Sequence, residues 1–226
     1  MNTSEQKEFQ AWVKDYGIQI GSSHIAILSR YLSELLKWNK VMNLVGLSSR
    51  QRILSELLFD SLIPLPYLPN KGNYLDLGSG GGFPGIPIKA CKPGLRLILI
   101  EAISKKVSFL KQVIRLLKLT DITVLNGRIE DNANLLNPNG YDLITARAVS
   151  SLDQIILWCA PLLSQEGILI TFQGSHLNQI LENSQNIIKE QDLILLKTVS
   201  YTLPGKKAPR RHLLIFKKTG VVSNVS

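Results

Sequence analysis

The spacing of hydrophobic positions changes near residue 70. From Ser22 onward, apolar residues recur every three or four positions, as in an amphipathic helix, and Ser22 or Ser23 could cap its start. A second helical segment covers residues 53–62 and stops at a cluster of prolines, which a helix cannot cross. We therefore predict a helical N-terminal extension over residues 1–70, with its apolar stripes packed in a core.

Beyond residue 70, short apolar runs alternate with amphipathic stretches. Strands are predicted over residues 74–78, 95–101, 122–126, 141–148 and 167–172. Helices are predicted over residues 86–91, 104–118 and 152–160. This alternation indicates an α/β domain over residues 71–226, in which a mostly parallel sheet has helices on both faces. Two later strand-like runs, 192–203 and 211–218, predict a closing hairpin and bring the sheet to seven strands.

The turn after the first predicted strand is rich in glycine and proline, and residues 74–87 read YLDLGSGGGFPGIP. In a doubly wound sheet, ligands bind at the carboxyl ends of the strands. Gly78, Gly80 and Gly82 would let the backbone pass close beneath a nucleoside-like ligand, because they have no Cβ. A GxGxxG spacing ending at Gly85 is present, but it is out of register with the strand end for a dinucleotide.

Acidic residues stand at the ends of the first two predicted strands. Asp76 would disfavour a pyrophosphate and favour a cationic ligand, such as the sulfonium and ammonium groups of S-adenosylmethionine. Glu101 lies about twenty residues past the turn and could accept hydrogen bonds from both hydroxyls of a ribose. Each acid has a plainer alternative role, which is to cap the neighbouring helix. After the third strand, Ile129 could pack on an adenine ring, next to Glu130.

Composition narrows the class of protein. The chain has 226 residues and a formal charge of +9, which favours a polyanionic partner. Its start is polar and no apolar run approaches the length of a membrane span, so we expect no membrane association and a cytoplasmic location. Cys91 and Cys159 are isolated and the three histidines are scattered, so we expect no disulfide and no metal.

Basic residues gather in two places. The predicted helix over residues 104–118 carries Lys105, Lys106, Lys111, Arg115 and Lys118. After Asp192 the chain has no acid, and the loop LPGKKAPRRH carries Lys206, Lys207, Arg210 and Arg211. A solvated surface usually mixes charges of both signs, so one-sided clusters favour phosphate binding. We expect both clusters to contact an RNA backbone.

Several of these stretches resemble one known family. DLGSGGGFPGIP, EAISKKVSFL, GRIED and YDLITARA occur in the order found in the glucose-inhibited division protein B family of ribosomal RNA small subunit methyltransferases. WNKVMNLVGLSS, ELLFDSL and RHLLIFKK are also similar, so the resemblance runs from Trp38 to Lys218. It implies a Rossmann-like class I methyltransferase that uses S-adenosylmethionine to methylate N7 of one guanosine in 16S rRNA. We expect the partner to be 16S rRNA within the 30S subunit, and the enzyme to be a monomer.

The resemblance also implies residue roles. The family's cofactor contacts correspond to Gly78, Phe83, Ile129, Glu130 and Arg147. The family often has alanine or valine at Ile129 and aspartate at Glu101. Guanine N7 has a lone pair and no proton to lose, so transfer needs orientation rather than a general base or a metal.

Arg147 is the candidate catalytic residue, because it ends the fourth strand, where substrate-facing groups lie in this architecture. Its guanidinium could hold a phosphate or bond O6 of the target guanine. A salt bridge to Asp76 or Glu130 is the alternative role.

Three other functions remain open at this point. A nicotinamide-dependent oxidoreductase would share the glycine turn and Glu101, although Asp76 and the register oppose it. A non-catalytic RNA-binding or ribosome-assembly protein would share the basic surface. Methylation of a small molecule or a protein would share the cofactor site.

Overall fold

A seven-stranded sheet forms the centre of the molecule. The computed structural model describes residues 1–131, 137, 139–205 and 210–219. The strand order is β3-β2-β1-β4-β5-β7-β6, and β7 runs in the direction opposite to the other six strands. The strands are β1 (Gly72–Leu77), β2 (Leu95–Glu101), β3 (Ile122–Asn126), β4 (Tyr141–Arg147), β5 (Leu163–Gln173), β6 (Leu193–Thr202) and β7 (Arg210–Lys218). The predicted seven-stranded, mostly parallel sheet with its closing hairpin is confirmed.

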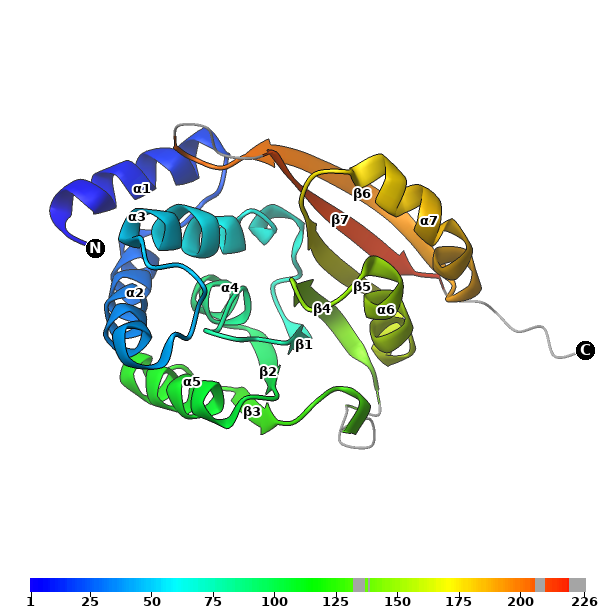
Figure 1. Ribbon diagram of the computed structural model, residues 1–226, viewed down its shortest axis with the longest axis horizontal. Helices are drawn as coiled ribbons and strands as arrows, with labels where there is room; N and C mark the ends of the chain where they lie inside the picture. The colour runs from blue at the N-terminus through cyan, green and yellow to red at the C-terminus, as the bar shows by residue number, and fades with distance from the viewer. Residues whose placement is uncertain (132–136, 138, 206–209, 220–226) are drawn as a thin grey trace, which may run out of the picture.

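Helices cover both faces of the sheet, as Figure 1 shows. The first face carries α1 (Thr3–Asp15), α2 (Ser22–Met42), α3 (Arg50–Arg52), the π-helical turn η1 (Ile53–Phe59), the 3-10 turns η2 (Asp60–Leu62) and η3 (Leu65–Tyr67), α4 (Gly85–Cys91) and α5 (Ser104–Leu117). The second face carries α6 (Leu152–Cys159), the 3-10 turn η5 (Ala160–Leu162) and α7 (Leu177–Glu190). No helix within the described ranges is both long and apolar enough to cross a bilayer.

Some elements differ from those predicted. Helix α2 has Gly21 as its N-cap, and the Gly21 amide donates to His24 Nδ1 at 3.0 Å, so neither Ser22 nor Ser23 caps it. The segment over residues 53–62 is helical, but it winds as a π-turn followed by a 3-10 turn. Helix α7 has no counterpart among the predicted elements.

Side chains along each strand alternate between two cores, because successive residues of a strand point to opposite faces. Tyr74 and Leu143 face the N-terminal helices, whereas Leu75 and Ile144 face α6 and α7. By the same alternation Arg147, four residues after Leu143, points toward the side of the N-terminal helices. The first core therefore lies between the sheet and the extension.

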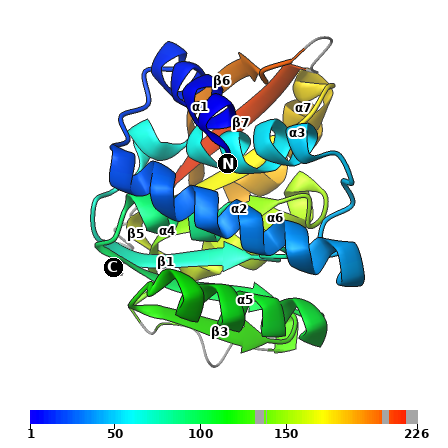
Figure 2. The same ribbon diagram turned by 90° about the vertical axis from the view of Figure 1, so that its left-hand side faces the viewer.

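The N-terminal extension packs on the sheet and reaches the glycine turn. Figure 2 shows α2 lying across this face beside α5. The ring of Phe59 makes edge contacts with the rings of Trp12 and Tyr16. The Tyr31 hydroxyl is fully buried and donates to the Gly81 carbonyl at 2.5 Å. Helix α2 thus holds the turn from the side of the extension.

Replacing Tyr31 with phenylalanine tests this contact. The buried Gly81 carbonyl would lose its donor, so we expect the free energy of unfolding to fall by about 1–3 kcal/mol. Urea denaturation measures the change. Tyr16→Phe is the matched control: its hydroxyl also donates to a carbonyl, that of Thr202, but at an exposed site where water can replace it. An equal loss for both variants would contradict the prediction.

Candidate functional site

A pocket of about 410 Å³ opens at the carboxyl ends of β1, β2 and β3. The predicted site residues Gly78, Glu101, Ile129 and Glu130 all line it. Its other lining residues are Leu77, Ile100, Ala102, Ile103, Gly127, Arg128, Val149 and Trp158. Because the ends of parallel strands meet at one edge of a sheet, the four loops that follow β1, β2, β3 and β4 contribute to a single concave site.

The floor of the pocket is bare backbone. Gly78 has φ +68°, and a Cβ placed there would come within 2.8 Å of Val149 Cγ2. Gly80 has φ +56°, and a Cβ there would have only the Gly78 carbonyl oxygen nearby, at 3.8 Å. Both glycines adopt a conformation that residues with side chains rarely take. Of these two glycines Gly78 lines the pocket and Gly80 does not, and at Gly78 the missing side chain makes room for Val149. The close approach of the backbone to a ligand stays a prediction.

Glu101 lines the pocket and also holds two loops in place. Its side chain is buried; Oε2 accepts from the Gly80 amide at 2.8 Å and Oε1 from the Ile103 amide at 2.8 Å. Ile103 is the N-cap residue of α5, so the helix-start role and the pocket-lining role coexist. An ionised carboxylate has about four acceptor positions, so it retains capacity for ligand hydroxyls.

Apolar side chains form the walls of the pocket. Ile129 is buried, whereas Ile103 is 44% exposed at the pocket. Trp158, from α6, completes this lining and was missed at the sequence level. The signal that could have found it is its place on the helix that follows the carboxyl end of β4. Apolar walls suit the flat base of a nucleoside, and a nearby carboxylate suits the hydroxyls of its ribose. The pocket therefore offers the environment that a nucleoside requires.

Asp76 is absent from the pocket lining, so its contact with a cationic ligand stays a prediction. The side chain is fully buried; Oδ1 accepts from Thr145 Oγ1 at 2.6 Å and Oδ2 from the Gly85 amide at 3.2 Å. Gly85 begins α4, so the helix-capping alternative describes this acid. Burial raises the pKa of Asp76 to about 6, against the opposing effect of the Thr145 hydrogen bond.

Phe83 packs away from the pocket. Its side chain is buried, and its ring centroid lies 5.3 Å from that of Tyr31 on α2. Phe83 is absent from the pocket lining, so the structure does not bring it together with Gly78 and Glu101. It belongs to the core between the glycine turn and the extension.

Arg147 turns toward the N-terminal extension. Its side chain is 10% exposed, and Nη2 lies 3.1 Å from Asp60 Oδ2. The expected alternative, a salt bridge to Asp76 or Glu130, is wrong, because the paired carboxylate is that of Asp60. Arg147 does not line the pocket. Asp60 was also missed: it occurs in ELLFDSL, where periodicity shows a helix and does not reveal a buried ion pair.

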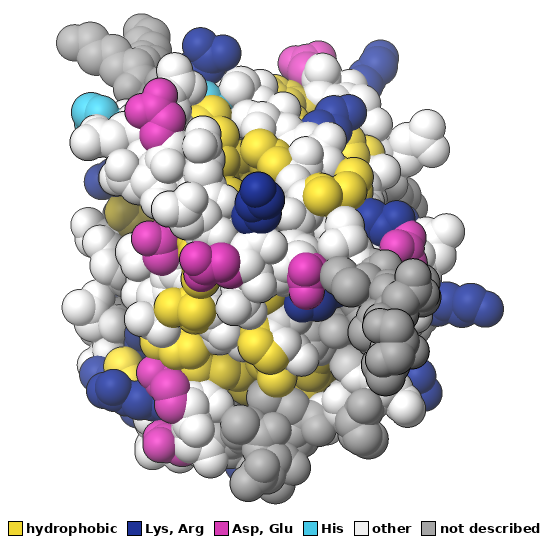
Figure 3. Space-filling model, turned by 90° about the vertical axis from the view of Figure 1, so that its right-hand side faces the viewer, with side chains coloured by type: hydrophobic (Ala, Val, Ile, Leu, Met, Phe, Trp, Pro, Cys, Tyr) yellow, Lys and Arg dark blue, Asp and Glu magenta, His cyan; other side chains and the backbone are white. Residues whose placement is uncertain are grey.

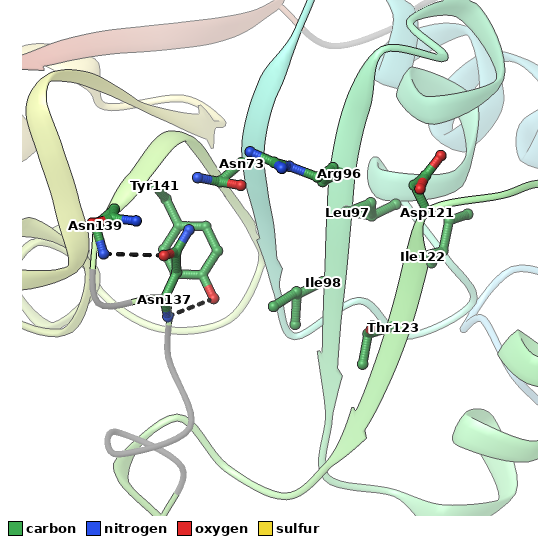
Figure 4. Close-up of a pocket in the computed structure, with 10 residues that line it drawn as sticks. All are labelled: Asn73, Arg96, Leu97, Ile98, Asp121, Ile122, Thr123, Asn137, Asn139 and Tyr141. Atoms are coloured by element: carbon green, nitrogen blue, oxygen red, sulfur yellow. Dashed lines mark hydrogen bonds between the residues drawn. The ribbon is translucent and has the colours of Figure 1, made fainter.

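A second pocket of about 530 Å³ lies at the opposite edge of the sheet, over the amino ends of β1 to β4 (Figure 4). Asn73, Arg96 and Tyr141 are among its lining residues. Ligands of doubly wound sheets bind at the carboxyl ends of the strands. The pocket lined by Gly78 and Glu101 is therefore the functional candidate, although the pocket at the amino ends is larger. Across the described residues, no group of three or more His, Cys, Asp or Glu side chains could hold a metal ion.

Comparisons with known proteins find relatives over most of the chain. The family model for "rRNA small subunit methyltransferase G" matches residues 24–214. The chain is 32% identical over 201 residues to a ribosomal RNA small subunit methyltransferase G of Geobacter sp. strain M21, covering 89% of this chain and 92% of that one. It is 34% identical over 214 residues to the protein of that name in Syntrophus aciditrophicus, covering 93% and 88%.

Solved structures show the fold class. A precorrin-6y C5,15-methyltransferase of Geobacter metallireducens superposes with a TM-score of 0.54 at 15% identity, over 70% of this chain and 87% of that one. TYW2 of M. jannaschii, solved in complex with AdoMet, superposes with a TM-score of 0.52 at 14% identity, over 66% and 68%. The expected Rossmann-like class I methyltransferase fold is confirmed.

Asp76 gives stability a defined pH dependence. Between pH 4 and pH 6 the unfolded chain loses the Asp76 proton, whereas the native state, with its pKa raised from 3.8 to about 6, retains it. The contribution of this group to stability therefore falls as pH rises and levels off above pH 7.

Asp76→Asn removes this titration, so the free energy of unfolding of the variant relative to wild type should rise by about 2.5 kcal/mol from pH 4 to pH 7. Urea titrations at each pH measure this difference, in which the other titrating groups cancel. A difference that is constant with pH would contradict the assignment.

Proposed function

Because the chain belongs to the rRNA small subunit methyltransferase G family, we propose that it transfers a methyl group from S-adenosylmethionine to N7 of a specific guanosine in bacterial 16S rRNA. The observation that carries this proposal is the convergence of Gly78, Glu101 and Ile129 in one pocket at the carboxyl edge. Membership of a methyltransferase family excludes the nicotinamide-dependent alternative. The substrate is proposed to be 16S rRNA within the 30S subunit, and the enzyme a monomer in the cytoplasm.

The pocket fits the nucleoside part of this cofactor. Bound there, S-adenosylmethionine would supply an electrophilic methyl group on its sulfonium. Glu101 would accept hydrogen bonds from the ribose hydroxyls, and Ile129 and Trp158 would flank the adenine. The absence of a Cβ at Gly78 lets Val149 pack against the backbone there, so that both residues line the pocket. Glu130, which also lines the pocket, is proposed to contact the cofactor.

The chemistry requires positioning more than proton transfer. Guanine N7 presents a lone pair and no proton, so no side chain has to act as a base. The chain's task is to hold the base in line with the methyl group and to exclude water, and such orientation can supply much of the reduction in the barrier. The apolar walls around Ile103 and Trp158 suit the exclusion of water.

Cations near the pocket support an RNA substrate. Lys105 and Lys106 lie in the first turn of α5, close to the pocket-lining Ile103, and neither pairs with a carboxylate among the described residues. Arg210 is exposed at the start of β7, which the antiparallel direction of that strand places at the carboxyl edge. The face that carries α7 differs, because it mixes acidic and basic side chains around apolar ones (Figure 3).

The basic residues of the predicted loop LPGKKAPRRH differ in their surroundings. Lys206 and Lys207 lie outside the described residues. Arg211 Nη2 lies 3.4 Å from Glu56 Oε2, and Arg211 Nη1 lies 3.9 Å from Asp60 Oδ2, so its charge is paired with carboxylates of the protein itself. Arg210 and the start of α5 are therefore the described cations that we propose as RNA contacts.

The direct test measures tritium transfer from labelled S-adenosylmethionine to purified 30S particles and to naked 16S rRNA, followed by digestion and identification of the labelled base. We expect label on N7 of one guanosine. Label on a protein, on a small molecule or on another nucleobase atom would contradict the proposal. The proposal would also be contradicted if neither 30S particles nor naked 16S rRNA were labelled. Absence of transfer together with retained RNA binding would favour the assembly-protein alternative.

Glu101→Gln should weaken the binding of S-adenosylmethionine about tenfold or more, because hydrogen bonds to a charged acceptor are worth roughly 1.5–3 kcal/mol. Calorimetry, or the fluorescence of Trp158 in the pocket wall, measures the Kd. The matched control is Glu182→Gln, the same substitution at an exposed position on α7. Unchanged affinity in Glu101→Gln would remove this residue from the cofactor site.

Reversing Lys105 and Lys106 to glutamate should weaken binding to 30S particles and reduce the dependence of log Kd on log salt by roughly 1–2, because two phosphate contacts are lost. Cofactor affinity should remain unchanged. The same double reversal at Lys111 and Arg115, farther along α5, is the matched control and should have a smaller effect. Equal effects of the two variants across a salt series would contradict a contact centred on the carboxyl edge.

A further inference from the structure

A buried carboxylate of the N-terminal extension contacts three strands. Asp60 is fully buried; its Oδ1 accepts from the Tyr201 hydroxyl of β6 at 2.5 Å. Its Oδ2 lies 3.1 Å from Arg147 Nη2 of β4 and 3.9 Å from Arg211 Nη1 of β7. Tyr201 and Arg147 come from the carboxyl ends of parallel strands, and Arg211 from the start of the antiparallel one. The extension is therefore joined to the sheet at the edge that carries the cofactor pocket.

The π-helical turn before Asp60 strengthens the contact to Arg147. Arg147 Nη2 donates to the Glu56 carbonyl, and Nη1 donates to the Leu57 carbonyl at 3.4 Å. The guanidinium also lies over the Phe172 ring, 5.6 Å from its centroid. Irregular π-turns often occur at functional sites, and this one directs backbone oxygens at a cation. The extension thus accepts two hydrogen bonds from Arg147 through its backbone and faces the same guanidinium with the Asp60 carboxylate.

Arg147 continues directly into the pocket wall. Ala148 follows with φ +51°, a left-handed conformation that a residue with a side chain adopts only when its surroundings enforce it. Val149 comes next; it lines the cofactor pocket and packs against the backbone of Gly78. The segment over residues 148–151 is consequently held at its start by Arg147 and against the glycine turn by Val149.

We propose that Asp60 is a positioning residue for methyl transfer. Through Arg147 it fixes the segment over residues 148–151, so that the wall of the cofactor pocket and the adjoining surface keep one geometry when the RNA base enters. The N-terminal extension is then part of the transferase apparatus rather than a cover for one face of the sheet. This inference rests on the proposed function, because it assigns a role in that reaction.

The energetics favour a role in geometry over a role in stability. A buried ion pair gives little net stability compared with apolar residues of similar size, because both ions must leave water. Removing one partner is costly, because the other charge is then buried alone. Asp60 faces Arg147, Arg211 and the Tyr201 hydroxyl, and Glu56 pairs with Arg211 beside it. Such a network specifies one arrangement of the strand ends.

The test compares two substitutions that each remove one interaction of the Asp60 carboxylate. Asp60→Asn keeps the size of the side chain and an acceptor for Tyr201 but removes the charge that holds Arg147. Tyr201→Phe is the matched control, because it removes the hydrogen bond to the other oxygen and leaves the ion pair with Arg147. Each variant is assayed for cofactor Kd, for kcat and KM with 30S particles, and for amide hydrogen exchange of the peptide over residues 146–151.

For Asp60→Asn we expect kcat to fall at least tenfold, cofactor Kd to change less than threefold, and residues 148–151 to exchange faster. For Tyr201→Phe we expect a fall in kcat of less than threefold and no faster exchange of that segment. Unchanged exchange in Asp60→Asn would overturn the proposal, as would equal falls in kcat for the two variants.

A third variant guards against simple misfolding. Asp60→Asn combined with Arg147→Met removes both charges, so neither is left buried alone, and the fold should recover while kcat stays low. Wild-type kcat in this folded double variant would overturn the proposal.

The exchange measurement needs no RNA. If wild type fails to methylate 30S particles, the proposed function is refuted, while exchange in Asp60→Asn still decides whether Asp60 holds the segment.

Discussion

The glycine turn depends on one buried carboxylate, that of Asp76. By accepting hydrogen bonds from the Gly85 amide and the Thr145 hydroxyl, it joins the end of β1 to the start of α4 and to β4. A buried carboxylate is costly unless its oxygens are paired, so the arrangement of these three elements is strongly constrained. The turn between them then exposes bare backbone at Gly78 to the cofactor pocket. An acid that does not line the pocket therefore helps to shape it.

The carboxyl edge has two sides, which the end of β4 separates. The cofactor pocket lies on the side of α6, where Trp158 and Ile129 line it. The N-terminal extension covers the other side, where Asp60 forms an ion pair with Arg147. A target base has to approach at this edge to meet the methyl group, so both sides bear on the reaction. This arrangement gives the extension a role that the sheet alone could not fill.

Much of this could be predicted from the sequence. Alternating strands and helices predicted the sheet, and strand ends that meet at one edge brought Gly78, Glu101 and Ile129 together. The direction of Arg147 was partly readable, because residues 143, 145 and 147 share one face of β4. Its partner was not, because Asp60 is far away in the sequence and no spacing rule relates the two. Nor does a charged residue in a strand reveal its depth, which is why the full burial of Asp76 could not be read from the sequence.

The long separation between Asp60 and its partners has a consequence for synthesis. Tyr201 follows Asp60 by 141 residues, and at about 5–20 residues per second the ribosome needs roughly 10–30 s to make the intervening chain. During that interval the network around Asp60 is incomplete, because Tyr201 and Arg211 have not yet been translated. All of the contacts of Asp60 can therefore form only after β6 and the start of β7 have been synthesised.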